Sequence, residues 1–384
     1  MRIQVRLPKV QPDEYDMPET CPYGCGGTYF RRHGQQGHTK TLRDPQYAEV
    51  TVYRYKCVAC GRTFRVYPQG VLKGAQQSAR LKGMVILLYV LGLSYGAIED
   101  FLYALGCGIG KTMAYYDVQA AGLVSRAQQR RKVQEGGQRP VVGADATYVK
   151  VLGVMTGIEV VVDDRTSELL GLDIIVSEKV TEILGIIEEV VEDVEGEVLV
   201  SDDHGAYNDV VDTLEVEHQL CRSHVQRNVD DLVDSLERQL KRQEPPPEET
   251  NLTPEQLRED LEHLKRLVRE RPPDGEDQLE TLYDCYKDVP VPPQGTKHSV
   301  WYRMRMLVTR LWNRWRKLTL DLTRPELKMD GTNNSSERLI GWWIKERYRT
   351  MRGYKREESI KNVVSLTTLM GAHEGYFDMT PLVT

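Results

Sequence analysis

Residues 141–151 read VVGADATYVKV, and this stretch decides the fold. Its β-branched residues indicate a strand, yet the strand carries an acid, Asp145, in an apolar setting. A buried carboxylate costs several kcal/mol unless it is paired or binds a metal. The stretch therefore predicts a buried strand with a functional carboxylate on it.

The patterns that follow extend this strand into a sheet. Residues 157–164 and 168–177 read as two further strands with hairpin-like links. Residues 181–194 read as a helix with one apolar side, and residues 198–203, VLVSDD, as a buried strand before another helix. Three strands, a helix, a strand and a helix predict an α/β fold with a mixed sheet rather than a purely alternating one.

A second acid ends the strand at residues 198–203. Asp202 lies where the carboxyl end of this strand opens onto the edge of the sheet. Asp203 competes for the same role. Because side chains alternate along a strand, only one of the two is expected to point to the inward face.

Four cysteines form two close pairs near the start of the sequence. Cys21 and Cys25 are followed, after 31 residues, by Cys57 and Cys60. Each pair can fold back as a knuckle, so that four thiolates give zinc its preferred tetrahedral sulfur ligands. An odd total of seven cysteines favours metal binding over disulfides. Residues 1–70 are therefore predicted to be a zinc ribbon with a structural zinc ion, unpaired cysteines being the alternative. His33 and His38 could replace a cysteine as ligand, but the four cysteines already complete the site.

Residues 71–125 are predicted to form a helix-turn-helix. One short helix begins near Tyr95, glycines around Gly106 break it, and a second helix begins at Lys111. The second helix could enter the major groove of DNA, which makes Lys111 a candidate DNA-binding residue. The packing of two core helices explains the same pattern equally well.

Two further segments are predicted from composition. The polar, basic residues 126–140 read as a linker, and residues 226–328 read as an all-helical insertion. Within the insertion, Thr253 and Pro254 indicate the start of a helix. A second, basic helix is expected at residues 298–318.

Charge is strongly segregated, although the formal net charge is only −6. Residues 151–217 carry 19 acids against two bases, and residues 301–361 carry 16 bases against seven acids. Such segregation is typical of a polyanion-binding surface beside an acidic metal-binding pocket. Two solvated faces of opposite charge are the alternative.

The stretch TNNSSERL, residues 332–339, is expected to begin a helix near Ser336. At 100° per residue, Glu337 and Glu346 lie on opposite faces, so both cannot reach one metal site. Glu346 is expected to form an internal salt bridge. Glu337 could be a metal ligand or only an acid favoured by the helix dipole. The basic residues expected on one neighbouring face, suited to DNA phosphates, are Arg338, Lys345, Arg349 and Arg352.

These motifs together resemble those of DDE transposases with a ribonuclease-H-like catalytic domain. The resemblance is nearest to the mutator-like group and related bacterial insertion-sequence enzymes, and it covers about residues 143–371. The motifs that carry it are GADATYVKV, VSDDHGAY, QLCRSHVQRN and TNNSSERL. One departure is Ala146, where many relatives have glutamate.

The resemblance implies a catalytic core at residues 141–225 and 329–384. It implies that Asp145, Asp202 and Glu337 are catalytic and bind two Mg²⁺ or Mn²⁺ ions. The implied reaction is cleavage of DNA and strand transfer. The implied partners are the terminal repeats of the element and target DNA, bound by a homodimer or a larger assembly.

The resemblance assigns Cys221 and His224 to a family motif near the second acid, with a structural or DNA-end role. Core packing explains the pair as well, and a further metal site would need more ligands than these two.

The longest apolar run, residues 84–93, is far shorter than a membrane span, and the start has no secretory signal. A cytoplasmic, nucleoid-associated protein without a membrane partner is therefore expected. Two other functions stay open: a domesticated, catalytically silent DNA-binding protein, and a ribonuclease-H-like nuclease without strand transfer. The retention of all three acids argues against the first.

Overall fold

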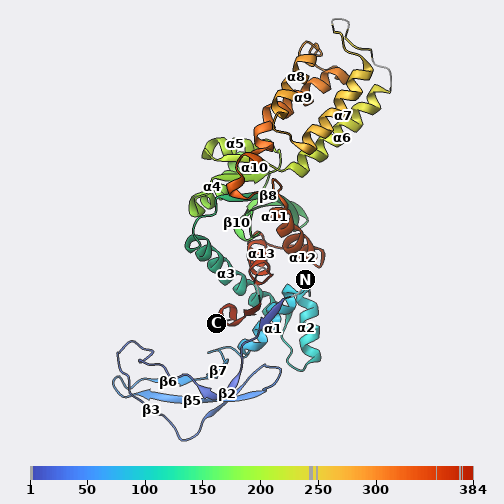
Figure 1. Ribbon diagram of the computed structural model, residues 1–384. Helices are drawn as coiled ribbons and strands as arrows, with labels where there is room; N and C mark the ends of the chain where they lie inside the picture. The colour runs from blue at the N-terminus through green and yellow to red at the C-terminus, as the bar shows by residue number, and fades with distance from the viewer. Residues whose placement is uncertain are drawn as a thin grey trace. The chain divides into compact units, whose positions relative to one another are not determined.

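The predicted strand at residues 141–151 forms the middle of a five-stranded sheet in the computed structural model (Figure 1). The order across the sheet is β10-β9-β8-β11-β12. β9 and β10 are antiparallel, whereas β11 is parallel to both β8 and β12. The strands are β8 (Val141–Val151), β9 (Val154–Asp163), β10 (Leu169–Ile175), β11 (Val198–Ser201) and β12 (Glu217–Leu220). The predicted mixed α/β sheet is thus confirmed, and β12 is a strand that the sequence patterns did not predict.

The structure describes residues 3–241, 245–247, 250–351, 353–371, 373 and 375–383. The chain divides into two compact units. The first comprises Met1–Lys132, Tyr148–Thr156 and Leu339–Thr384, and the second comprises Val133–Thr147 and Gly157–Arg338. In the described residues, none of the helices combines the length and the apolar character needed to cross a membrane.

Two helices of the second unit cover the sheet. α4 (Val180–Val194) and α5 (Gly205–Leu214) are strongly amphipathic, and their apolar residues share one core with residues of β8, β9 and β11. Fully buried members of this core include Ile183, Ile187 and Val210. Burial of an aliphatic side chain contributes about 1.5–3 kcal/mol, so these helices hold the sheet and the ends of its strands in place.

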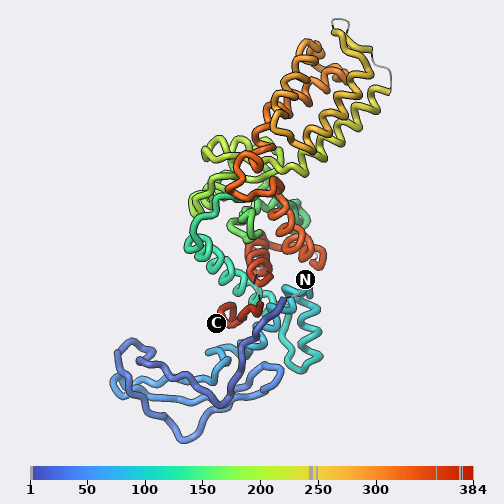
Figure 2. Tube along the Cα trace, in the orientation of Figure 1, coloured from blue at the N-terminus to red at the C-terminus, as the bar shows by residue number. Residues whose placement is uncertain are grey.

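The predicted insertion is a set of four packed helices. Figure 2 shows their traces running side by side. Thr253 caps one of them by accepting a hydrogen bond from the main-chain N–H of Gln256 at 3.1 Å, which confirms the predicted helix start. Gly275 is required because a Cβ there would lie 2.1 Å from the ring of Trp315. The helices are α6 (Arg222–Leu240), α7 (Pro254–Glu270), α8 (Gly275–Tyr286) and α9 (Val300–Leu318).

Three short helices follow the insertion, and the last of them carries Glu337. They are α10 (Leu320–Thr323), the 3-10 helix η1 (Pro325–Leu327) and α11 (Asn334–Leu339). Leu320, Leu327 and Met329 pack against Val141, Val198 and Val200 of the sheet. The returning chain is therefore fixed to the strands that carry the acids.

The start of the first unit is a small β structure around β5. β5 pairs antiparallel with β3, β4 and β6. These strands are β3 (Phe30–Arg32), β4 (His38–Thr41), β5 (Glu49–Cys57) and β6 (Thr63–Val66). Two further pairs are β1 (Gln4–Arg6) with β13 (Tyr376–Asp378), and β2 (Gln11–Tyr15) with β7 (Pro68–Gln69).

The first unit contains the helices α1 (Ala79–Val90), α2 (Tyr95–Ala104), α3 (Lys111–Glu135), α13 (Glu357–Gly371) and α14 (Thr380–Val383). Two of them, α2 and α3, begin where the sequence predicts them, near Tyr95 and at Lys111. The elements α2 and α3 match the two helices expected on either side of Gly106. Whether they read DNA as a helix-turn-helix stays a prediction.

The predicted linker at residues 126–140 is helical as far as Glu135, because α3 continues through it. Its polar residues bind α13: Gln129 donates to the carbonyl of Ser365 at 3.2 Å, and Arg126 pairs with Glu358. Composition indicated a linker, but these polar side chains serve a helix–helix contact, and the first helix-breaking glycine is Gly136.

The helix that carries Glu337 is not uniform, which corrects one prediction. α11 continues into a π-helical segment, Ile340–Lys345 (η2), and then into α12 (Glu346–Arg349). Because a π-helix bonds residue i to i+5, the assumed 100° per residue does not hold across it. The angular argument for a common face of Arg338, Lys345 and Arg349 therefore does not hold, and the common face itself stays a prediction. Arg352 lies outside the described residues.

Candidate active site

The register of two parallel strands brings the first two acids together. Val200 of β11 pairs with Gly143 of β8. Asp202 and Asp145 each follow two residues later, so they lie side by side at the same level of the sheet. Acids that are 57 positions apart in the sequence thus meet because β8 and β11 are adjacent and parallel.

Asn333 brings the third acid to the same place. Its buried side-chain amide donates to the carbonyl of Ala144 at 2.9 Å, directly before Asp145. The main-chain carbonyl of Asn333 accepts a hydrogen bond from the main-chain N–H of Glu337 at 3.1 Å, and this bond lies in the first turn of α11. Gly143 permits this approach, since a Cβ there would lie 2.8 Å from the Ser336 hydroxyl. The start of α11 is therefore fixed against β8.

The carboxylates are close enough to repel one another. Burial, and then the negative charges of Asp202 and Glu337, raise the pKa of Asp145 to about 7, against a weaker opposing effect of the Ala146 N–H and His224. A group of oxygen ligands with this excess of negative charge suits hard divalent cations such as Mg²⁺. The donor set thus fits the metal that the resemblance implies.

Cys221 and His224 lie beside Glu337. Cys221 is buried at the start of α6, and the main-chain N–H of Asn333 donates to its sulfur at 3.3 Å. The Nε2 atom of His224 lies 3.5 Å from Oε1 of Glu337. Burial raises the pKa of the Cys221 thiol, but hydrogen bonds from His224 and Asn333 outweigh it and the pKa is lowered. His224 thus lies against the third acid, and the sulfur of Cys221 lies within 4.8 Å of a carboxylate oxygen of Glu337. The role of the pair stays a prediction.

Sequence reasoning missed a fourth acid, Glu159 of β9. Its side chain is fully buried, and the hydroxyl of Tyr207 donates to both of its oxygens, at 3.0 and 3.2 Å. Burial raises the pKa of Glu159 to about 8 against the hydrogen bond from Tyr207, and the charges of Asp145, Glu178 and Asp202 raise it further. The signal was present in the sequence, since GIEVVVD sets an acid among apolar residues as GADA does at Asp145.

The free energy of unfolding of wild type should fall as the pH rises, and Glu159→Gln should make this fall smaller. The carboxyl of Glu159 ionises near 4.5 when unfolded and near 8 when folded, so folding loses stability as pH rises through this window. Glutamine keeps a hydrogen bond to Tyr207 and has no charge to bury. In Mg²⁺-free buffer we expect the variant to gain roughly 5–10 °C in Tm over wild type at pH 8 and little at pH 4.5. A constant Tm difference across thermal scans from pH 4.5 to 8 would contradict this origin.

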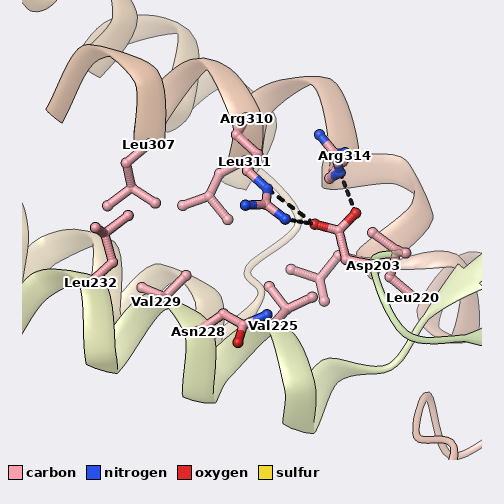
Figure 3. A pocket seen from close by; sticks show the side chains of 11 residues that line it. Asp203, Leu220, Val225, Asn228, Val229, Leu232, Leu307, Arg310, Leu311 and Arg314 are labelled. Carbon is pink, nitrogen blue, oxygen red and sulfur yellow. Dashed lines mark hydrogen bonds and ion pairs between the residues drawn. The ribbon is translucent and has the colours of Figure 1, made fainter. Parts of the chain in front are cut away.

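Asp203, the competitor of Asp202, has a different role. Figure 3 shows Arg310 and Arg314 of α9 pointing to its carboxylate, and both form ion pairs with it. Its side chain is only 6% exposed. Asp202 instead accepts the main-chain N–H of His204 at 3.0 Å. Asp203 therefore fixes the insertion to the loop that carries Asp202, next to the small cavity between α6 and α9.

The candidate DNA-binding residues differ in their surroundings. Lys111, Arg338, Lys345 and Arg349 are exposed. Arg349 pairs with Glu346 at 2.8 Å, which confirms the predicted salt bridge of Glu346. Arg347, by contrast, is buried over the ring of Tyr89 and has a structural place in the first unit.

The four predicted cysteines meet in the first unit. Sγ of Cys21 lies 3.8 Å from that of Cys60, and Sγ of Cys25 lies 3.7 Å from that of Cys57. Four sulfurs at about 2.3 Å from a central zinc ion would be separated by about 3.8 Å, so the cluster fits zinc. The main-chain N–H of Cys60 and other hydrogen bonds lower the pKa of Cys57 to about 7 against burial.

A comparison with protein families gives one match. Residues 184–349 match the family model described as Transposase IS66 family. The match includes Asp202, the helical insertion and Glu337, and it begins after Asp145. None of the curated proteins compared with the chain matches it. The family match supports a transposase of an insertion-sequence family, while the mutator-like group stays a prediction.

Proposed function

We propose that the protein is a transposase that binds the ends of a DNA element and catalyses metal-dependent cleavage and strand transfer. Asp145, Asp202 and Glu337 are the catalytic acids in this proposal. The observation that carries it is the proximity of the three acids: Asp202 follows β11 at the level of Asp145 in β8, Asn333 fixes the start of the helix that carries Glu337, and the charges of both Asp202 and Glu337 raise the pKa of Asp145.

The strand order supports a ribonuclease-H-like core. The central β8 has β9 and β10, antiparallel to each other, on one side and the parallel strands β11 and β12 on the other. Asp145 lies within β8, and Asp202 directly follows β11. The helical insertion then separates Asp202 from Glu337 in the sequence, and Asp203 holds it to the core. This arrangement explains how a gap of 135 positions still yields one site.

The three carboxylates would hold two Mg²⁺ or Mn²⁺ ions, which stabilise the attacking and leaving oxygens of a phosphodiester. Asp145, whose pKa both other acids raise, would hold these ions together with Asp202 and Glu337. The partly buried carboxylate of Asp145 would remain ionised beside cations despite its raised pKa. Behind the site, the carboxyl of Glu159 accepts hydrogen bonds from the Tyr207 hydroxyl, and burial raises its pKa.

DNA is the proposed partner. Lys111, Arg338, Lys345 and Arg349, with Arg352, are the proposed phosphate contacts, and the cysteine cluster would hold a structural zinc ion. Two element ends must be joined, so a homodimer or larger DNA complex in the cytoplasm, associated with the nucleoid, is proposed.

A catalytically silent DNA-binding protein of the same fold is the second proposal to be tested. The convergence of all three acids disfavours it, because the loss of one acid would suffice to silence the site.

The test is an assay of cleavage and strand transfer with Mg²⁺ or Mn²⁺ on DNA that carries the flanking ends of the element. We expect wild type to nick and join these ends, and Asp145→Ala to bind them without cutting. Binding is measured separately by gel shift, since the proposed phosphate contacts are remote in sequence from Asp145. Wild type that binds the ends but never cuts would favour the silent protein, and wild type that cuts unrelated DNA without joining would favour a simple nuclease.

A further inference from the structure

A second set of metal ligands adjoins the catalytic acids. Cys221, His224 and Glu337 each offer one ligand atom, and these atoms all lie within 4.8 Å of one another. Among the described residues, the only other cluster of this kind is the four-cysteine site. Sulfur, imidazole nitrogen and one carboxylate oxygen are a softer donor set than the carboxylates of Asp145 and Asp202.

The geometry is near that of a zinc site. Zinc bonds of about 2.0–2.3 Å in a tetrahedron separate neighbouring ligand atoms by roughly 3.3–3.7 Å. His224 and Glu337 already have this separation, at 3.5 Å between Nε2 and Oε1. The Glu337 side chain is 42% exposed, so a change of rotamer can adjust its distance to the Cys221 sulfur.

The surroundings also suit a bound thiolate. Cys221 occupies the N-cap of α6, where helix dipole and free N–H groups favour negative charge. The N–H of Asn333 already donates to its sulfur. His224 follows within the first turn, so the spacing Cys-x-x-His places both ligands on one side of the helix start. Three protein ligands leave a fourth position for water, as in open zinc sites.

We propose that Cys221, His224 and Glu337 bind a zinc ion, and that this ion holds Glu337 away from Asp145 and Asp202. Glu337 is common to both sets of ligands, so one carboxylate serves either the zinc ion or the Mg²⁺ ions. Hard Mg²⁺ does not compete for a thiolate, whereas Zn²⁺ binds sulfur and nitrogen well. Zinc would then inhibit cleavage. This last step rests on the proposed transposase function, whereas the zinc site itself does not.

The test measures bound zinc per chain in full-length protein after equilibration with Zn²⁺ and removal of free metal. The variants are Cys221→Ser and His224→Ala, and the matched control is Cys285→Ser, an exposed cysteine in α8 outside both clusters. Wild type and Cys285→Ser should hold one zinc ion more than either ligand variant. With Co²⁺ in place of zinc, the difference spectrum between wild type and Cys221→Ser should show thiolate-to-metal absorption. Circular dichroism establishes whether each variant is folded. If Cys221→Ser does not fold, the comparison of wild type with His224→Ala decides the result.

Equal zinc content in all four proteins would overturn the site, whatever their activity. If the site is present, zinc should inhibit cleavage by wild type at concentrations at least about tenfold lower than those needed for Cys221→Ser, each compared with its own zinc-free rate. Equal zinc sensitivity would overturn the competition for Glu337. Zinc bound at the site in a protein that never cuts DNA would support the site and contradict the transposase proposal, so the two can fail separately.

Discussion

Asp202→Asn is expected to lower the rate of Mg²⁺-dependent cleavage by roughly 10³-fold or more, whereas Asp203→Asn should stay within about tenfold of wild type. The two residues are adjacent and chemically identical, so the comparison removes most differences other than position. Asp202 follows β11 at the level of Asp145 in the adjacent parallel strand β8, and its charge raises the pKa of Asp145. Asp203 is occupied by ion pairs with Arg310 and Arg314. Because both arginines are partly exposed, the loss of these pairs should weaken the insertion only moderately.

A second matched pair lies in the last helix. Glu337→Gln should abolish cleavage to a similar extent, and Glu346→Gln should leave it near wild type, because Glu346 only forms an exposed ion pair with Arg349. The measurement is the single-turnover rate of nicking at saturating protein, with DNA binding assayed in parallel. Full activity of Asp202→Asn together with loss in Asp203→Asn would exchange the roles of the two aspartates. Full activity of Glu337→Gln would show that Glu337 is not one of the catalytic acids.

The parts of this site that could be predicted from local sequence are those where a residue differs in chemical type from the residues around it. Asp145 within Val-Val-Gly-Ala-Asp and the two close cysteine pairs are such cases, and their environments agree with the sequence interpretation. Glu159 is an equal contradiction in β9 and was predictable by the same reasoning. Its partner Tyr207 was not, because the contact joins β9 to α5 across 48 positions.

The features that sequence could not provide are set by tertiary packing. The π-helical segment Ile340–Lys345 has the composition of an ordinary helix, and the ring of Trp343 within it lies where a Cβ of Gly371 would be. The choice between Asp202 and Asp203 depends on arginines more than 100 positions away. The polar composition of residues 126–135 indicates a linker when the sequence is considered alone. In the structure these residues belong to α3, and α13 provides hydrogen-bond partners for them. Local propensity is a weak prior wherever a distant element completes the contact.

Cys57→Ser is expected to abolish zinc binding by the four-cysteine cluster and to unfold the β structure that surrounds it. The apolar core cluster of this region is small: its buried members are Val10, Leu42, Val50 and Val71, and Val52 and Val66 are also buried in the same β structure. Such a core contributes only a few kcal/mol, whereas a structural zinc ion contributes about 10–16 kcal/mol in small domains. Cys57 is the last residue of β5, to which β3, β4 and β6 all pair, so its loss affects every strand of that sheet.

The measurement is hydrogen exchange of backbone amides in the full chain. The control variant is Cys107→Ser, which changes another buried cysteine of the first unit. Amides of β3, β5 and β6 should lose protection by at least about 10³-fold in Cys57→Ser, whereas those of α6–α9 in the second unit keep theirs. Cys107→Ser should retain both the zinc ion and the protection of β5. If β5 stays protected without zinc, its pairing with three strands suffices for folding, and the cysteines would then be free for redox chemistry instead of structure. If protection is lost together with the ability to bind DNA ends while Mg²⁺-dependent nicking of nonspecific DNA persists, the zinc-bound region recognises the ends and the carboxylates act independently of it.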